Sequence, residues 1–201
     1  MRRWRPGRRP DHPPDCLTVI QSSTEAALLV PVREAERLVG HWRMRFEPSA
    51  RKGVPAHITV LYPFLQPAAI TRDIEVALQE LFAATAPFDF ALTQTRRFGT
   101  QTLYLTPEPP GPFVDLTLAV WDRFPNHRPY RGEFSEIIPH LSVVICEEPG
   151  SCDDPVSIMR DVEHAIVPSM PVKCRATEVW LMEGDERWRV RQTFPLAVEI
   201  R

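Results

Sequence analysis

The chain has 201 residues, of which 43% are hydrophobic and 25% are charged, and its formal net charge is −2. This is the composition of an ordinary globular protein, long enough for one domain or for two small lobes that share a core. The charge excludes a strongly basic nucleic-acid coat protein, although a local basic cleft remains compatible with it. No apolar run approaches the ~20 residues of a membrane span, so we expect no membrane partner.

The first fifteen residues, MRRWRPGRRPDHPPD, are basic but lack the apolar segment of a secretory signal. We therefore expect residues 1–15 to be a disordered leader and residues 16–201 to form a single bilobal domain. The four cysteines (Cys16, Cys146, Cys152 and Cys174) contain no C-x-x-C pair and do not cluster with histidine. This pattern argues against a zinc site and a disulfide framework, and it favours the reducing cytoplasm.

In the first half of the chain, predicted strands and helices alternate. Residues 27–32 (ALLVPV) are predicted to form a strand, and apolar residues at three- and four-residue steps predict a helix over 33–46. The alternating stretch PAHITVLYPF (55–64) predicts the next strand. Thr71 can cap the helix that follows it. Two more strands are predicted, PFDFALTQTRRF (87–98) and TLYLTP (102–107).

The second half repeats this order. The strand TLYLTP leads to a helix near 113–124, a strand IPHLSVVI (138–145), a helix near 154–166 and a strand VKCRATEVWLME (172–183), before a last strand, RWRVRQTFPLAVEI (187–200). A unit of strand, helix, strand, helix, strand therefore occurs twice. We predict an α+β fold in which two sheets face each other across a central groove, with helices outside.

Each half places a histidine and a hydroxyl two residues apart in an apolar strand. Side chains at i and i+2 of a strand share a face, so His57 projects with Thr59 and His140 with Ser142. If the halves are related by a two-fold axis, the two pairs meet. Such a set suits attack at phosphorus, because one imidazole can accept a proton while the other donates one. The hydroxyls can donate to the non-bridging oxygens.

A lone H-x-T is uninformative, since a histidine on an apolar strand is more often a hydrogen-bonded core residue than a catalyst. Two such motifs at matching places in a repeated unit are much harder to obtain by chance. The other histidines fit surface or incidental roles: His12 in the leader, His41 and His164 in helices, and His127 in a loop.

With these two motifs, HITVLYPF and PHLSVV, the chain resembles the 2H phosphoesterase superfamily of 2′-5′ RNA ligase-like (LigT-like) proteins. The resemblance implies a bilobal fold with two antiparallel sheets, and activity on 2′,3′-cyclic or 2′-5′-linked phosphodiesters. It also implies that His57 and His140 are the catalytic histidines and that Thr59 and Ser142 contact the phosphate. Ser142 stands where threonine is common in the family. We expect no metal and no cofactor.

Further substrate-binding candidates lie elsewhere in the sequence. Tyr130 and Arg131 precede the second motif in a loop that could overhang the groove, where an aromatic ring can stack on a base and a guanidinium can contact phosphate. Tyr104 could face the groove or the core. Arg189 alternates with Trp188 in the last strand, as do its neighbours Arg187 and Arg191, and this basic face could either grip phosphates or face solvent.

Three functions remain open from the sequence. The first is a metal-independent phosphodiesterase, or reversible 2′-5′ RNA ligase, acting on an RNA end or a small cyclic or 2′-5′ nucleotide. The second is an RNA-end or nucleotide binding protein with little turnover. The third is a structural module in which the histidines only bond within the core. We expect a cytoplasmic monomer without an obligate protein partner.

Overall fold

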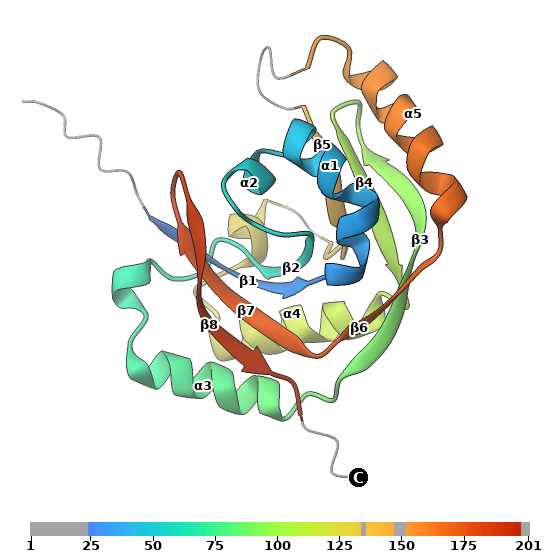
Figure 1. Ribbon diagram of the computed structural model, residues 1–201. Helices are drawn as coiled ribbons and strands as arrows, with labels where there is room; N and C mark the ends of the chain where they lie inside the picture. Colours follow the sequence, from blue (N-terminus) through green and yellow to red (C-terminus); the bar gives the residue numbers. More distant parts are fainter. Residues whose placement is uncertain (1–23, 134–135, 147–151, 198–201) are drawn as a thin grey trace, which may run out of the picture.

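A computed structural model describes residues 24–133, 136–146 and 152–197 (Figure 1). The expected leader and Cys16 lie outside the described residues. The structure confirms an α+β fold with two four-stranded antiparallel sheets. The first sheet has the strand order β2 (His57–Leu61), β1 (Glu25–Pro31), β7 (Glu178–Gly184) and β8 (Trp188–Pro195). The second has the order β5 (Leu141–Ile145), β4 (Thr102–Glu108), β3 (Phe88–Phe98) and β6 (Val172–Ala176).

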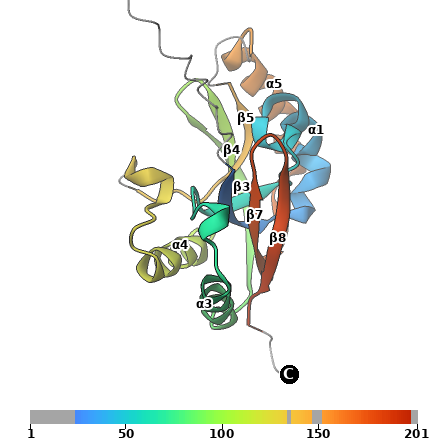
Figure 2. The same ribbon diagram turned by 90° about the vertical axis from the view of Figure 1, so that its left-hand side faces the viewer.

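The α-helices are α1 (Glu36–Phe46), α2 (Pro48–Arg51), α3 (Arg72–Ala83), α4 (Gly111–Arg123) and α5 (Pro155–Ile166). Four short 3-10 helices accompany them: η1 (Arg33–Ala35), η2 (Pro67–Ala69), η3 (Pro129–Gly132) and η4 (Val167–Ser169). Helix α1 packs against β5, whereas α4 packs against β2 and α3 against β8. Each half of the chain therefore supplies a helix that supports the motif strand of the other half. Figure 2 shows α1 and α5 on the opposite side of the β3–β4 pair from α4.

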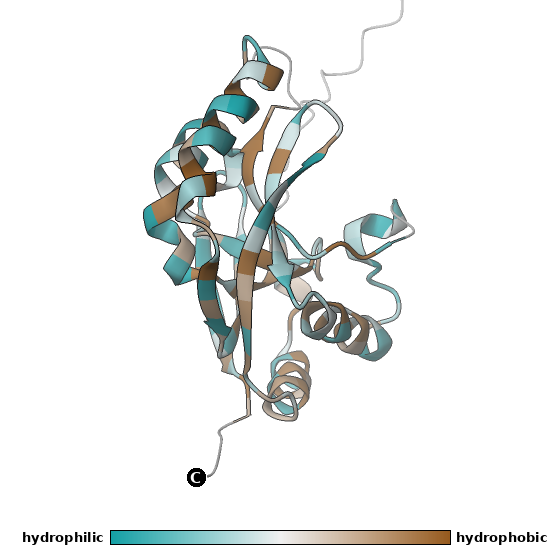
Figure 3. Cartoon of the chain, turned by 90° about the vertical axis from the view of Figure 1, so that its right-hand side faces the viewer, coloured by the Kyte–Doolittle hydropathy of each residue, from teal (hydrophilic) through white to brown (hydrophobic). Residues whose placement is uncertain are grey.

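The burial pattern of the strands follows their hydrophobic alternation. In β1, Ala26, Leu28 and Val30 belong to the main core, in which Phe82 of α3 also meets Phe194 of β8 at a centroid distance of 5.6 Å. Leu29 points to the other side of the sheet and joins a separate small cluster. The helices are amphipathic and carry both hydrophobic and hydrophilic positions (Figure 3). Thr71 does occupy the N-cap of α3, but its side chain makes no capping hydrogen bond.

The segment 172–183, predicted as one strand, is two strands in different sheets. The chain leaves the second sheet after Ala176 and enters the first sheet at Glu178. The buried positions change phase at this point, from Cys174 and Ala176 to Val179 and Leu181. A strand that keeps one register on one sheet cannot change phase, because its side chains alternate with period two. The phase change is visible in the sequence and marks the crossing.

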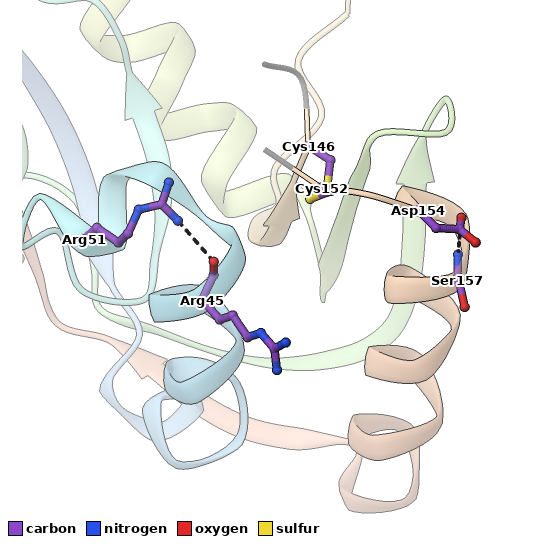
Figure 4. The surroundings of a disulfide bond; sticks show 6 residues. All are labelled: Arg45, Arg51, Cys146, Cys152, Asp154 and Ser157. Carbon is purple, nitrogen blue, oxygen red and sulfur yellow. Dashed lines mark hydrogen bonds between the residues drawn. A yellow bond between two sulfur atoms is a disulfide. The ribbon is translucent and has the colours of Figure 1, made fainter. Parts of the chain in front are cut away.

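Cys146 and Cys152 form a disulfide, with their Cα atoms 5.6 Å apart (Figure 4). This corrects the expectation that the cysteines are unpaired. Cys146 directly follows β5, and Cys152 lies two residues before Asp154, the N-cap of α5. The ends of these two elements bring the cysteines within disulfide range although their spacing matches no familiar motif. Cys174 is a free, buried cysteine, as expected of a small core residue.

None of the helices in the described ranges has the length and apolar character needed to cross a bilayer.

Candidate active site

The two motif histidines are held in the same way. His57 is the first residue of β2, and its Nδ1 lies 2.7 Å from the carbonyl oxygen of Pro55. His140 directly precedes β5, and its Nδ1 lies 2.7 Å from the carbonyl oxygen of Ile138. A carbonyl can only accept, so each Nδ1 must carry the hydrogen. This tautomer leaves each Nε2 as the nitrogen with a lone pair that can exchange a proton.

The two histidines lie near each other across the contact between β2 and β5. Burial lowers the pKa of His57 to about 4, and the charges of Arg43 and, to a smaller extent, His140 act in the same direction. Burial also lowers the pKa of His140. Both imidazoles are therefore neutral near pH 7 in the free protein. Any bound anion would raise both pKa values, because it stabilises the charged form.

The motif hydroxyls lie beside their histidines. Thr59 shares a strand face with His57, and its side chain is hydrogen-bonded to Tyr130. Ser142 shares a face with His140 and pairs across the sheet with Tyr104 of β4. The structure thus places a hydroxyl near each imidazole, with an aromatic residue beside each pair.

Aromatic rings surround His140. Its ring lies 5.1 Å from that of Phe98 and 5.2 Å from that of Tyr104, measured between centroids, in edge-on geometries. Phe98 and Tyr104 stack on each other at 4.1 Å. These contacts limit the rotation of the imidazole and exclude water from two of its sides. Arg96 lies close enough to Tyr104 that its charge acts on the pKa of the phenol, which burial raises overall.

A buried arginine joins the two halves behind the motifs. Arg43 of α1 is only 2% exposed, and its Nε donates to the backbone carbonyl of Ser142 over 3.1 Å. Its guanidinium also donates to the carbonyl of Val54 (3.3 Å) and to the carboxylate of Glu47 (2.8 Å). One side chain therefore ties the second motif strand to the segment that leads into the first.

A turn of unusual backbone geometry covers Thr59. Tyr130 and Arg131 in η3 have φ angles of 49° and 56°, which are sparsely populated for residues other than glycine. The turn is held by a hydrogen bond from the Tyr130 N–H to the Tyr62 carbonyl (2.7 Å) and by an ion pair between Arg131 and Glu25 (3.3 Å). Strained conformations that are held in this way are frequent at binding sites.

The sequence of the chain matches a family model over most of its length. The model of the 2′-5′ RNA ligase superfamily matches residues 30–188. The chain belongs to this superfamily. A comparison with curated proteins found no significant match.

Solved structures support the same fold for this superfamily member. Escherichia coli LigT, solved in complex with 3′-AMP, matches with a TM-score of 0.53 and 15% identity, over 88% of this chain and 99% of LigT. A Thermus thermophilus protein matches with a TM-score of 0.58 and 17% identity, over 87% of this chain and 99% of its own. A structure described as a phosphoesterase gives 0.54 and 16%, over 88% and 99%. At these identities the likeness concerns the fold.

Most of the site residues predicted from the sequence lie close together in the structure, but one of them does not. The site contains the two motif pairs together with Tyr104 and Tyr130. Arg131 lies at its edge, because it directly follows Tyr130 in the chain. Arg189 does not join them. It pairs with Glu183 across β7 and β8, on the face that also carries the core residue Leu181. His57 and Thr59 project from the opposite face, where Trp188 joins the Leu29 cluster.

Three neighbours of the site were not predicted from the sequence. Phe98 and Arg96 carry a weak signal, because both lie in an alternating strand and share a face with Tyr104, the register partner of Arg96. Arg43 carries almost no such signal, since it is one of two arginines in the last turn of its helix. Among the described residues, no three His, Cys, Asp or Glu side chains group closely enough to hold a metal ion.

Proposed function

We propose that the chain is a metal-independent phosphodiesterase, or a reversible 2′-5′ RNA ligase, that acts on 2′,3′-cyclic or 2′-5′-linked nucleotides and RNA ends. The observation that carries this proposal is the matched pair of imidazoles, each bonded through Nδ1 to the carbonyl two residues before it. Membership of the superfamily supports a reaction at a phosphodiester. The complex of LigT with 3′-AMP supports a nucleotide as the ligand.

In the proposed hydrolysis, His57 is the base and His140 the acid. Nε2 of His57 takes a proton from water, the water oxygen bonds to phosphorus, and the bond from phosphorus to one ribose oxygen breaks. Nε2–H of His140 gives its proton to that leaving oxygen. Burial and the charge of Arg43 keep His57 neutral, as a base requires. The anionic substrate raises the pKa of His140, which supplies the protonated acid.

The neighbouring groups have supporting roles in this proposal. The hydroxyls of Thr59 and Ser142 donate to the non-bridging oxygens, on which negative charge must be stabilised. Tyr130, which already bonds Thr59, and Tyr104 border the nucleotide, while Arg131 contacts a phosphate. Arg189 has no part in it, because it projects from the other face of its sheet. We expect the protein to act as a monomer.

A panel of 2′,3′-cyclic, 2′-5′-linked and 3′-5′-linked nucleotides, incubated with the protein and EDTA, tests the proposal. We expect product from the first two classes, unchanged by EDTA. We expect a loss of about 10²–10⁴-fold in kcat for His57→Ala and for His140→Ala, the typical contribution of one general acid or base. His164→Ala, in α5, is the matched control. Full activity in either motif variant would reject the proposal.

The second candidate, a nucleotide or RNA-end binding protein with little turnover, also has an observation in its favour. The lowered pKa values leave both imidazoles neutral in the free protein, so no acid is ready before the ligand binds. Tight binding of an RNA with a 2′,3′-cyclic end, without product, would establish this function in place of catalysis.

A further inference from the structure

The disulfide between Cys146 and Cys152 lies at the end of the second motif strand (Figure 4). Cys146 is the first residue after β5 and is buried, with 4% of its surface exposed. Cys152 is half-buried, so its Sγ is the sulfur that a reductant can reach. A bond between cysteines only six positions apart restricts the unfolded chain less than one that closes a long loop. Its reduction should therefore change the anchoring of β5 without unfolding the protein.

The disulfide holds the end of the β3–β4 hairpin from two sides. The N–H of Cys146 donates to the carbonyl of Gln101, in the turn between β3 and β4, over 2.9 Å. Cys152 leads into α5, and Glu163 of this helix forms an ion pair with Arg97 of β3. The bond thus fixes β5 and α5 relative to each other, and both of these elements contact the hairpin.

The same end of the hairpin carries Phe98, which packs against the second motif histidine. Phe98 is the last residue of β3 and directly follows Arg97. Its ring lies 5.1 Å from that of His140 and stacks on Tyr104 at 4.1 Å. With 37% of its surface exposed, Phe98 is held mainly by these two rings and by the position of its backbone. A shift of the hairpin end therefore moves Phe98 relative to the imidazole.

We propose that the disulfide is a redox switch of the candidate active site, in which the oxidised form holds Phe98 against His140 and reduction by a dithiol lowers activity. This inference rests on the proposed function and adds its regulation. A thiolate of the dithiol attacks Sγ of Cys152, and Cys146 leaves as a thiolate. The second thiolate of the dithiol then attacks the sulfur of the first and releases Cys152. Two electrons and two protons pass in total from the dithiol to the two cysteines.

The test compares the oxidised protein with protein reduced by dithiothreitol, using 2′,3′-cyclic AMP as the substrate. Alkylation by iodoacetamide and mass measurement report how many cysteines are free. Reduction should lower kcat/KM about tenfold, within the ~10²-fold that a misplacement of 1 Å can cost. Reoxidation with oxidised glutathione should restore the activity. Cys152→Ser should have the lower activity in both conditions. The matched control is Cys174→Ala, which removes a free cysteine and should respond as the wild type does.

A second measurement reports on the imidazole without any need for turnover. Burial lowers the pKa of His140, so the displacement of Phe98 should raise this pKa in the reduced protein. The proton resonances of His140, assigned by comparison with His140→Gln, give the pKa in each redox state. Phe98→Leu should raise the pKa in the oxidised protein and leave little further change on reduction, which a general loosening of the fold would not produce.

The outcomes separate the two proposals. If alkylation shows complete reduction while kcat/KM and the titration of His140 stay unchanged, the switch is overturned and the proposed function stands. A bond that dithiothreitol does not reduce in the folded protein would also overturn the switch. A His140 titration that moves with the redox state, in a protein that turns over none of the nucleotides, would support the switch as a device of the fold and overturn the catalytic function.

Discussion

Replacing Arg43 with methionine tests whether this arginine joins the two halves of the chain. Methionine keeps the unbranched apolar stem but removes the donors to Ser142, Val54 and Glu47. Removing one partner of a buried ion pair typically costs about 3–5 kcal/mol, because the remaining charge stays buried. Glu47 is only 4% exposed, but it keeps donors from the Ser49 N–H and hydroxyl and from the Ala50 N–H. We therefore expect the lower end, about 3 kcal/mol.

Urea unfolding followed by tryptophan fluorescence measures this loss. A change of 1 kcal/mol moves the melting temperature of a chain of this size by about 2–4 °C, so Arg43→Met should melt roughly 6–12 °C lower. Arg45→Met is the matched control on the same helix, since Arg45 is exposed and such substitutions usually change stability by less than about 0.5 kcal/mol. Adding Glu47→Gln to Arg43→Met should recover part of the loss, because it removes the uncompensated charge.

Arg43→Met also has an expected effect on the site that a loss of stability alone would not cause. The charge of Arg43 lowers the pKa of His57, so its removal should raise that pKa and move the acid limb of the pH profile of kcat/KM to higher pH. If Arg43→Met is no less stable than Arg45→Met, or the acid limb stays in place, the assigned role is wrong.

The remaining predictions concern pH and the disulfide. Because the pKa values of both free imidazoles are lowered, that of His57 to about 4, kcat/KM should peak below pH 6.5, and an optimum above pH 7 would contradict the assignment of acid and base. As pH falls from about 6.5 to 4, His57 takes up a proton in unfolded chains before it does in folded ones, so the wild type loses stability in this window. The variant His57→Gln lacks this loss. Between pH 7 and pH 4.5, its free energy of unfolding, measured by urea titration, should fall by up to about 2–3 kcal/mol less than that of the wild type. Cys146→Ser should lower the unfolding free energy by roughly 2 kcal/mol, the value for a short closed loop. Dithiothreitol should lower the unfolding free energy of the wild type by a similar amount and leave that of Cys146→Ser unchanged. If the unfolding transition of the wild type does not move with dithiothreitol, the disulfide is absent.

The order of the elements and the pairing of the motifs could be predicted because they depend on local periodicity. A period of two places His57 with Thr59 and His140 with Ser142, whatever the rest of the chain does. The repeated order of strands and helices predicted the α+β class, which the structure confirms. The catalytic roles of these residues remain proposals.

The site residues that the sequence placed wrongly or missed depend on contacts between segments that are distant in the chain. Alternation separates Arg189 from Trp188, but it cannot say which face of the strand lies on the side of the histidines. Here the bulky Trp188 shares that side, in a small cluster with Leu29 and Val54, while Arg189 finds Glu183 on the other. Arg43 likewise depends on a carbonyl 99 residues away. Such contacts are set by tertiary packing, which carries no local signature.

The crossing of strands between the sheets bears on how the chain could be divided. A cut in the β3–β4 hairpin, at Gly99–Gln101, would leave β1, β2 and β3 on one fragment and β4 to β8 on the other. The first sheet would then take two strands from each piece, and the second would take one from the first piece and three from the second. Neither piece could close a sheet by itself, so the fragments would regain structure only by complementing each other. Each sheet therefore draws strands from both parts of the chain, and we expect the two parts to fold only together.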